Sequence, residues 1–227
     1  YSITMTNAPD RILYEDEHLL AVNKLRGELV VKGKGKVGKL PLLDFLRKDY
    51  PGLRAVHRID FETSGVILFA KTKKAADALM SKKSDQVSPQ EKNQWKKYYT
   101  AIVMGRIQRK QGAIRSPLPA RSGGMVSAET LYSVAELFDN STLVDIEIAT
   151  GRHHQIRRHF AGIKHPLVLD RVYGHKKFNG IFQQELGYRD FFLHASAMEL
   201  QHPVTKAHIR IDAPLPRAFA YVVRKLG

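Results

Sequence analysis

The segment from His57 to Gly65, HRIDFETSG, holds two carboxylates, an imidazole, a guanidinium and two hydroxyls within nine residues. Carboxylates and imidazoles move protons or attack substrates, and a guanidinium binds anions in a fixed geometry. Taken by itself, however, the segment is typical of a charged turn before a strand, with Asp60 as the capping residue. Its chemical meaning therefore depends on the segments that accompany it.

Three further segments follow in order: Lys97–Gly105 (KYYTAIVMG), Gly151–Arg157 (GRHHQIR) and Leu193–Ala195 (LHA). Together with the Asp60 segment they resemble the RluA-type family of RNA pseudouridine synthases. The resemblance extends from about Ile12 to Pro216, nearly the whole chain. Four motifs in this order are specific to that family.

The resemblance implies an α+β fold, in which helices and loops flank a central mixed, mainly antiparallel sheet and an RNA-binding cleft crosses it. The family isomerises uridine within RNA: the base is detached from C1′, rotated and rejoined through C5. Because the bonds broken and made balance, the resemblance implies no ATP, redox cofactor or metal. The implied partner is structured RNA, either ribosomal or transfer RNA.

Residue by residue, Asp60 matches the catalytic aspartate of the family. A carboxylate beside the ribose can act as a nucleophile or as the base that removes a ribose proton, and the sequence does not choose. Arg58 matches the arginine that helps to take the target base out of the helix, as chemistry on a stacked base requires. Tyr99 matches an aromatic residue that stacks under the flipped uracil and can assist removal of the C5 proton, although an inward strand tyrosine is the plainer interpretation.

Arg157 matches the arginine paired with the catalytic carboxylate, where a fixed cation would keep Asp60 ionised. For Arg152 and Gln155 a phosphate contact and a structural hydrogen bond are equally consistent with the pattern. Leu193 matches an apolar wall of the uracil pocket, although core packing alone would also explain a leucine in a strand.

The chain departs from the family pattern at several positions. In Asn23–Gly27 (NKLRG), Leu25 stands where the pattern has a proline, so a rigid turn is lost. The other departures are a histidine for threonine, an additional arginine and a leucine for glycine, at His153, Arg158 and Leu169. Because we expect these positions in RNA-facing loops, they bear on substrate choice rather than on activity.

Two other patterns suggest different chemistry. Gly33–Lys39 (GKGKVGK) contains GxGxxG and the start of a phosphate-binding loop, but Leu40 follows where the latter needs Ser or Thr. The acid expected about 20 residues on, Asp60, falls in a polar turn rather than at a strand end. We therefore expect a basic loop that touches phosphates, and no bound nucleotide cofactor.

Five histidines are spaced too irregularly for a typical metal site, and no acidic residue lies among them before Asp170. We expect them to form hydrogen bonds or to stack, and we expect no metal. They are His153, His154, His159, His165 and His175.

The charge balance indicates a polyanionic partner. The 227 residues contain 37 Lys and Arg against 22 Asp and Glu, a net charge of +15, which is most typical of nucleic-acid-binding proteins but also of membrane-surface proteins. Two windows, Gly105–Ala128 and Gly151–Leu169, contain basic residues and no acidic ones. The chain has no cysteine, which excludes disulfides and thiolate sites and fits a reducing compartment. No apolar run approaches a membrane span, so we expect a cytoplasmic protein without a membrane partner.

Hydrophobic periodicity predicts the elements that must position these residues. It indicates strands over 11–15, 18–24, 66–70, 99–103, 144–148, 191–200 and 206–211, and helices over 41–49, 73–82, 154–163 and 216–226. A surface loop is expected over 81–94. Strands interrupted irregularly by helices favour an α+β fold over a regular βαβ array.

We expect one catalytic domain over residues 1–227, acting as a monomer and without an S4-like RNA-binding module in this chain. Because the chain begins with Tyr1 rather than Met, a segment upstream could have been removed. The leading hypothesis is an RNA pseudouridine synthase. The alternatives are a non-catalytic RNA-binding or RNA-chaperone protein on the same fold, and a nuclease or RNA glycosylase. The sequence shows no carboxylate cluster of the kind that metal-dependent nucleases use.

Overall fold

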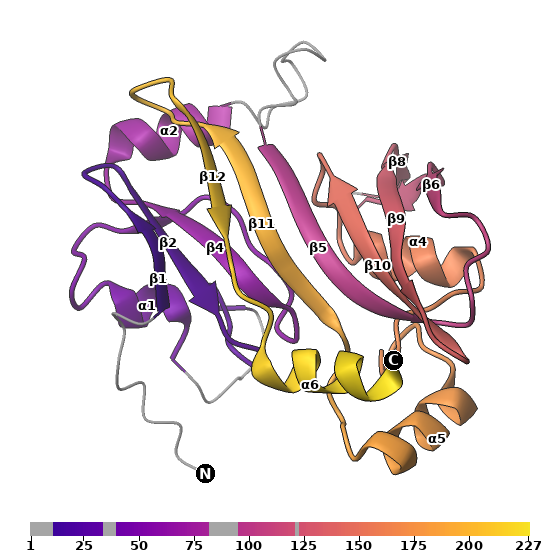
Figure 1. Cartoon of the computed structure of the whole chain (residues 1–227). Coiled ribbons are helices and arrows are strands. Elements are labelled where there is room, and N and C mark those ends of the chain that lie inside the picture. The colour runs from indigo at the N-terminus through magenta and orange to yellow at the C-terminus, as the bar shows by residue number, and fades with distance from the viewer. Residues whose placement is uncertain (1–10, 34–39, 82–94, 121–122) are drawn as a thin grey trace. The chain divides into compact units, whose positions relative to one another are not determined.

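A computed structural model of the chain describes residues 11–33, 40–81, 95–120 and 123–227 (Figure 1). The strands are β1 (Ile12–Glu15), β2 (Leu19–Lys24), β3 (Arg54–Ala55), β4 (Ser64–Ala70), β5 (Trp95–Met104), β6 (Gln111–Ile114), β7 (Leu118–Pro119), β8 (Met125–Val126), β9 (Thr130–Leu137), β10 (Ser141–Ile148), β11 (Leu193–Gln201) and β12 (His208–Asp212). The helices are α1 (Leu42–Leu46), α2 (Lys73–Ser81), α4 (Gln155–Gly162), α5 (Lys176–Leu186) and α6 (Arg217–Leu226). Every strand pair whose register is described is antiparallel, which confirms the expected α+β fold with a mainly antiparallel sheet.

The chain divides into two compact units, residues 1–95 with 197–214, and residues 96–196 with 215–227. The boundary falls inside β11, so each unit contains part of this strand. The expectation of a single domain stays a prediction. Most of the two predicted loops, over 32–39 and 81–94, lies outside the described residues.

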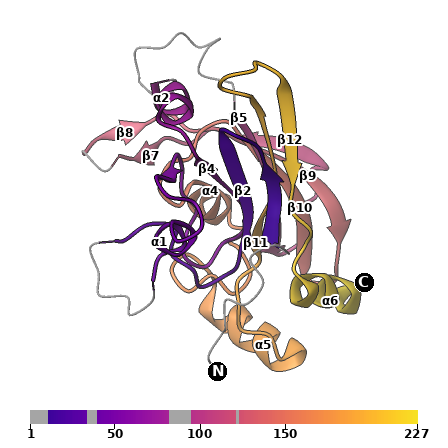
Figure 2. The same cartoon turned by 90° about the vertical axis from the view of Figure 1, so that its left-hand side faces the viewer.

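In the first unit, β1, β2 and β4 lie side by side, β3 adds to β4, and β12 pairs with β11 (Figures 1 and 2). Alternate residues of β2 and β4 face opposite sides of the sheet, and both sides are buried. One side packs on α2 through Leu19, Ala21, Val66, Leu68, Ala76 and Leu79. The other packs on α1 through Leu20, Val22, Ile67, Phe69, Leu42 and Leu46. This double cover explains the nearly continuous apolar runs in both strands and makes them a rigid base for the loop that precedes β4.

In the second unit, the strand order is β5-β10-β9-β6, and β7 and β8 form a separate pair. Tyr99 on β5 lies opposite Ile146 on β10. Phe192, just before β11, contacts Phe182 of α5 and Phe219 of α6, with ring centroids 5.9 and 4.9 Å apart. Burying these large rings fastens both helices to the same segment of chain.

The predicted strands over 11–15, 18–24, 66–70, 99–103, 144–148, 191–200 and 206–211 and the predicted helices over 41–49, 73–82, 154–163 and 216–226 are confirmed, with shifts of a few residues at their ends. The helix α5, the strand β3 and the strands β6 to β9 were not predicted. The strand β9 is largely exposed or half-buried, so it carries little hydrophobic signal. Among the residues that the structure describes, no helix combines the length and the apolar character needed to cross a membrane.

Candidate active site

Asp60 lies in the first unit, in the loop between β3 and β4, and is half-buried. The Thr63 N–H donates to the Asp60 carbonyl at 3.2 Å, which closes a tight turn around Asp60. Two residues earlier, Arg58 is exposed. His57 does not face solvent in the same way: its Nε2 accepts from the Leu68 N–H at 2.9 Å, and its ring meets Trp95 edge-on. The loop is therefore anchored at His57 and turned at Asp60.

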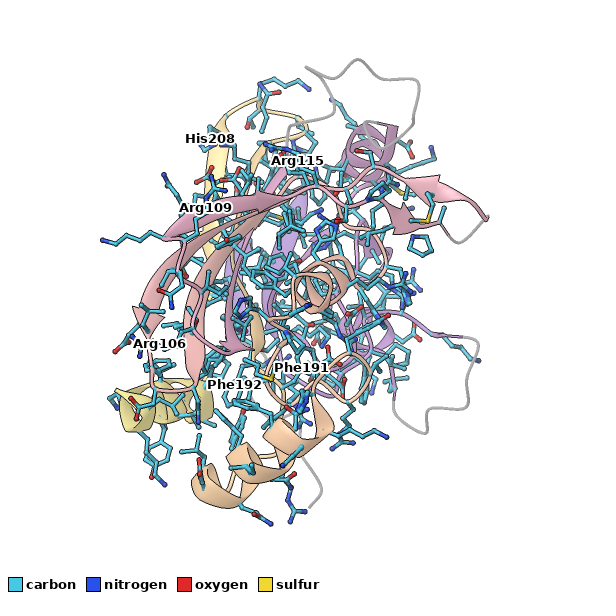
Figure 3. The ribbon with its side chains drawn as sticks, turned by 90° about the vertical axis from the view of Figure 1, so that its right-hand side faces the viewer. Arg106, Arg109, Arg115, Phe191, Phe192 and His208 are labelled. Carbon is cyan, nitrogen blue, oxygen red and sulfur yellow. The ribbon has the colours of Figure 1, made fainter. Side chains whose placement is uncertain are left out.

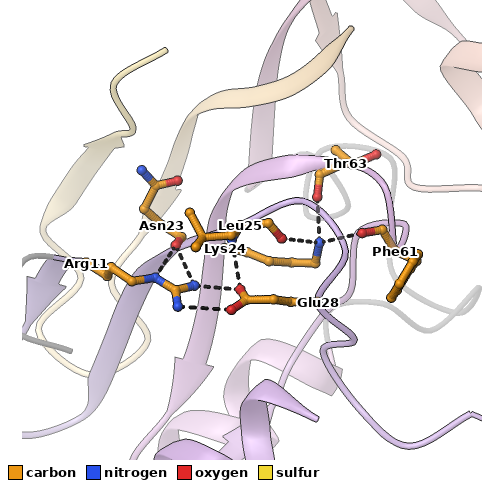
Figure 4. A network of polar contacts seen from close by, with 7 residues as sticks. All are labelled: Arg11, Asn23, Lys24, Leu25, Glu28, Phe61 and Thr63. Atoms are coloured by element: carbon orange, nitrogen blue, oxygen red, sulfur yellow. Dashed lines mark hydrogen bonds and ion pairs between the residues drawn. The ribbon is translucent and has the colours of Figure 1, made fainter. Parts of the chain in front are cut away.

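Lys24, at the end of β2, is fully buried beside this loop (Figure 4). Its Nζ donates to three carbonyl oxygens, those of Leu25 at 3.0 Å, Phe61 at 3.1 Å and Thr63 at 2.6 Å. An ammonium group has three N–H donors, so the three carbonyls satisfy it completely. Lys24 thus binds the loop on the C-terminal side of Asp60.

Burial lowers the pKa of Lys24 to about 7, although the negative charges of Glu28 and Asp60 oppose the shift. The negative charge of Asp60 is therefore close enough to raise the pKa of Lys24. Sequence reasoning missed this residue. A lysine at the end of a strand normally points its ammonium group into water, and no local signal marks this one as buried.

Arg157, in the second unit, lies on the first turn of α4 and forms a two-point ion pair with Asp170. Its Nε donates to Asp170 Oδ2 at 2.6 Å and its Nη2 to Oδ1 at 2.8 Å. The guanidinium also lies 5.1 Å from the ring centroid of Phe191 and 5.2 Å from that of Tyr173. A guanidinium held by two hydrogen bonds and packed against two aromatic rings has one orientation.

Burial by itself would raise the pKa of Asp170, but the hydrogen bonds from Arg157 and from the Tyr173 and Val172 N–H groups outweigh it, and the pKa is lowered. Asp170 therefore stays ionised opposite Arg157. The preceding Leu169 has a φ of 63°, the left-handed conformation that favours glycine. This explains why a glycine is usual at that position and shows that the backbone is strained next to Asp170.

Gln155, also on α4, is 3% exposed. Its Oε1 accepts from the Thr150 hydroxyl at 2.7 Å and the Arg152 N–H at 3.2 Å, while its Nε2 donates to the Glu129 carbonyl at 2.8 Å. These bonds fit the structural alternative for Gln155 better than a phosphate contact. Arg152, in contrast, is exposed at the turn before α4.

Tyr99 and Leu193 both lie in the second unit and are 7% and 5% exposed. Their places on β5 and at the start of β11 agree with the strands predicted for them. The structure thus gathers Arg58 and Asp60 in one loop, and Arg152, Gln155 and Arg157 in one turn and helix. The pairing of Arg157 with Asp60 and the RNA-binding cleft stay predictions, because Asp60 and Arg157 belong to different units.

The histidines have partners of several kinds. His159 Nε2 lies 2.9 Å from the Ser116 carbonyl and its Nδ1 2.8 Å from the Thr130 hydroxyl. His165 Nδ1 lies 2.8 Å from the Met104 carbonyl, and His175 caps α5 through the Phe178 N–H. The His153 and His154 rings stack at 3.8 Å. Burial lowers the pKa of His159, so its imidazole is neutral in this network.

The two basic windows differ in exposure. Among its described residues, the first exposes four cations, three of them labelled in Figure 3: Arg106, Arg109, Lys110 and Arg115. In the second, Arg157 is buried and Arg158 is half-buried, with its Nε bonded to the Tyr173 hydroxyl at 3.0 Å. The absence of acidic residues from a stretch of sequence therefore does not make all of that stretch a basic surface.

Comparison with known proteins agrees with this fold. Residues 18–162, which contain Asp60, Tyr99 and Arg157, match the family described as RNA pseudouridylate synthase. A ribosomal large subunit pseudouridine synthase C from Vibrio vulnificus (strain CMCP6) is 36% identical over 226 residues, covering 96% of this chain and 69% of the relative. The protein of that name from Yersinia pestis is 38% identical over 221 residues, covering 91% and 66%. The solved structure of human RNA Pseudouridylate Synthase Domain Containing 4 has a TM-score of 0.76 and 25% identity, covering 96% of this chain and 93% of that one.

The fold and the ordered motifs define an RNA-modifying isomerase. The chain belongs to the RNA pseudouridylate synthase family, which confirms the resemblance to the RluA-type enzymes. It spans about two thirds of the length of the two bacterial relatives.

Proposed function

We propose that this chain isomerises uridines in ribosomal RNA to pseudouridine, with Asp60 as the catalytic carboxylate. Two kinds of observation support the proposal: the names of the relatives, and the position of Asp60 in a tight turn whose neighbouring carbonyls are held by the buried Lys24. A half-buried carboxylate on a rigid turn meets the positional demand of catalysis, since misplaced groups lose much of their effect.

The reaction needs no net addition or removal of atoms. The C1′–N1 bond breaks, the base rotates, a C1′–C5 bond forms, the C5 proton leaves and N1 takes up a proton. Asp60 acts either by attacking the sugar or by removing a ribose proton. As the family resemblance implies, Arg157 is the cation that serves the catalytic carboxylate, Tyr99 stacks on the uracil and Leu193 walls its pocket.

The target uridine must leave its stack before the base can be detached, and the exposed Arg58 assists by filling the place of the base. The exposed cations Arg106, Arg109 and Lys110, together with Arg152, bind phosphates of the RNA and set its register. We further propose that the protein acts in the cytoplasm as a monomer and needs no cofactor.

Tritium release from [5-³H]uridine-labelled large-subunit ribosomal RNA transcripts tests the proposal, because rejoining through C5 frees the tritium into water. We expect release by the wild type and loss of release in Asp60→Asn, which keeps the shape of the side chain. Asp77→Asn removes an exposed carboxylate of α2 and serves as the control. Release from transfer RNA alone would place the target in that class. An Asp60→Asn variant that still releases tritium would remove Asp60 from the proposed role, and a wild type inactive on both RNAs would favour a non-catalytic RNA-binding protein.

A further inference from the structure

The turn that follows β2 holds the Asp60 loop by its backbone. The Gly27 N–H donates to the Phe61 carbonyl at 2.8 Å, and the same oxygen accepts from Lys24 Nζ at 3.1 Å. Lys24 reaches Thr63 as well, at 2.6 Å. The residue directly after Asp60 is therefore bonded twice to this turn, and any shift of the turn is passed on to Asp60.

This turn has little intrinsic rigidity. Gly27 has a φ of +76°, a conformation open to glycine, and glycine is the most mobile residue of the unfolded chain. Leu25 is 42% exposed, so the packing of its side chain does not fix the backbone. It also stands where the family pattern has a proline, whose ring would fix φ. Side-chain contacts must therefore hold its backbone.

Glu28 and Arg11 supply that support (Figure 4). Arg11 donates to both carboxylate oxygens of Glu28, from Nη1 to Oε1 at 3.0 Å and from Nη2 to Oε2 at 2.6 Å. Arg11 is itself fixed to the Asn23 carbonyl through Nε at 3.0 Å and Nη2 at 2.9 Å. The side chains of Arg11 and Glu28 are 21% and 17% exposed. A two-point pair of this kind fixes orientation as well as distance.

The carboxylate of Glu28 also accepts from the Leu25 N–H, from backbone nitrogen to Oε2, at 2.8 Å. A proline at position 25 has no N–H and could not form this bond. The side chain of Glu28 thus closes the same turn that a proline would stiffen by covalent restraint. The brace formed by the side chains of Arg11 and Glu28 therefore compensates for the missing proline.

We infer that Glu28, clamped by Arg11, is a positioning residue: it holds the Lys24–Glu28 turn in place of a proline, and through that turn it fixes the backbone beside Asp60. The expected effect of Glu28 on turnover rests on the proposed role of Asp60. The expected effect of Glu28 on the backbone does not depend on that role.

Glu28→Ala tests the inference in the tritium-release assay. We expect kcat to fall about 10- to 100-fold, as for other small misplacements, while KM stays unchanged, because Glu28 is not required to touch RNA. Glu199→Ala is the matched control: it breaks a 2.6 Å pair with Arg210 in the same unit, and its side chain is 19% exposed. We expect Glu199→Ala to leave kcat within about twofold of the wild type.

Restoring the proline separates positioning from a general loss of stability. Glu28→Ala leaves the Leu25 N–H without its acceptor. Leu25→Pro removes that N–H and fixes φ at position 25. We therefore expect Leu25→Pro alone to keep wild-type kcat, and the double variant Leu25→Pro/Glu28→Ala to recover most of the activity lost by Glu28→Ala. Full turnover by Glu28→Ala, an inactive Leu25→Pro, or a double variant no better than Glu28→Ala would each overturn the inference.

Hydrogen exchange tests the backbone without relying on activity. In Glu28→Ala, we expect the amides of Gly27 and Thr63 to exchange at least about tenfold faster than in the wild type or in Glu199→Ala, because both are bonded within the braced turn and the Asp60 loop. Unchanged exchange would overturn the inference even if the enzyme is active. Faster exchange in a protein whose wild type releases no tritium would support the brace and refute the proposed function instead.

Discussion

Arg157 and Asp170 form a buried two-point ion pair, with side chains only 4% and 0% exposed and a shortest N–O distance of 2.6 Å. Asp170 also accepts from the Val172 N–H at 2.8 Å and the Tyr173 N–H at 3.1 Å. The carboxylate therefore ties the start of α4 to the turn after Leu169. A buried charge pair is costly to desolvate, and its two hydrogen bonds fix the orientation of the Arg157 guanidinium.

Asp170→Asn should destabilise the protein by about 3 kcal/mol or more, because it leaves the guanidinium of Arg157 buried without a compensating charge. Urea unfolding measures the loss. Asp212→Asn is the control, since Asp212 pairs with Arg210 on the surface and its loss should cost at most about 1 kcal/mol. An equal loss of stability in the two variants would contradict the larger cost expected for breaking the buried pair.

Two glycine-to-alanine changes, one beside Asp170 and one inside α5, should change stability in opposite directions. A Cβ at Gly174 would collide with the backbone carbonyl of Asp170, so Gly174→Ala should cost about 1–3 kcal/mol. A Cβ at Gly180, inside α5, would meet nothing within 4 Å, so Gly180→Ala should stabilise by about 0.5–1 kcal/mol. Thermal unfolding of both variants checks the prediction, and a stabilised Gly174→Ala would show that the segment can move away from Asp170.

Lys24 should make stability depend on pH. Its folded pKa, about 7, lies below the unfolded value, so between the two the unfolded chain binds more protons and stability rises with pH. Below pH 7 the cost of burying the cation is fully present. Urea unfolding from about pH 6.5 to about pH 8.5 should show a slope up to about 1.4 kcal/mol per pH unit steeper in the wild type than in Lys24→Met. The difference in slope between the two proteins isolates the contribution of Lys24 from that of other titrating groups. Equal slopes in the wild type and Lys24→Met would mean that the pKa of Lys24 is not lowered.

Removing exposed cations of the first basic window should weaken RNA binding in a salt-dependent way. Arg109→Gln and Lys110→Gln each remove an exposed charge (Figure 3 labels Arg109). For each phosphate that a variant no longer neutralises, the slope of log affinity against log salt concentration should become shallower by about 0.7–0.9. Filter binding at several salt concentrations measures this slope. Lys73→Gln, on α2, is the control, and an equal change there would indicate a general charge effect.

Periodicity alone predicted most of the elements that carry the candidate site. The apolar runs in Leu19–Val22 and Val66–Ala70 follow from burial of both faces of a sheet, a property that each strand displays by itself. The helix predicted over 154–163 agrees with α4 to within one residue at each end. The exposed strand β9 and the helix α5, with a single residue classed as buried, have no such pattern, so both were missed.

The sequence by itself determined the family, the mainly antiparallel α+β fold and the segment that contains Asp60, because these depend on patterns within short stretches of chain. Only the tertiary structure decided which groups hold the site in place. Lys24 meets Thr63 across 39 residues, Arg11 meets Glu28 across 17, and Arg157 meets Asp170 across 13. A buried lysine and a surface lysine have the same local sequence signal. What distinguishes them is desolvation and the carbonyls that compensate for it, and these exist only after the chain has folded.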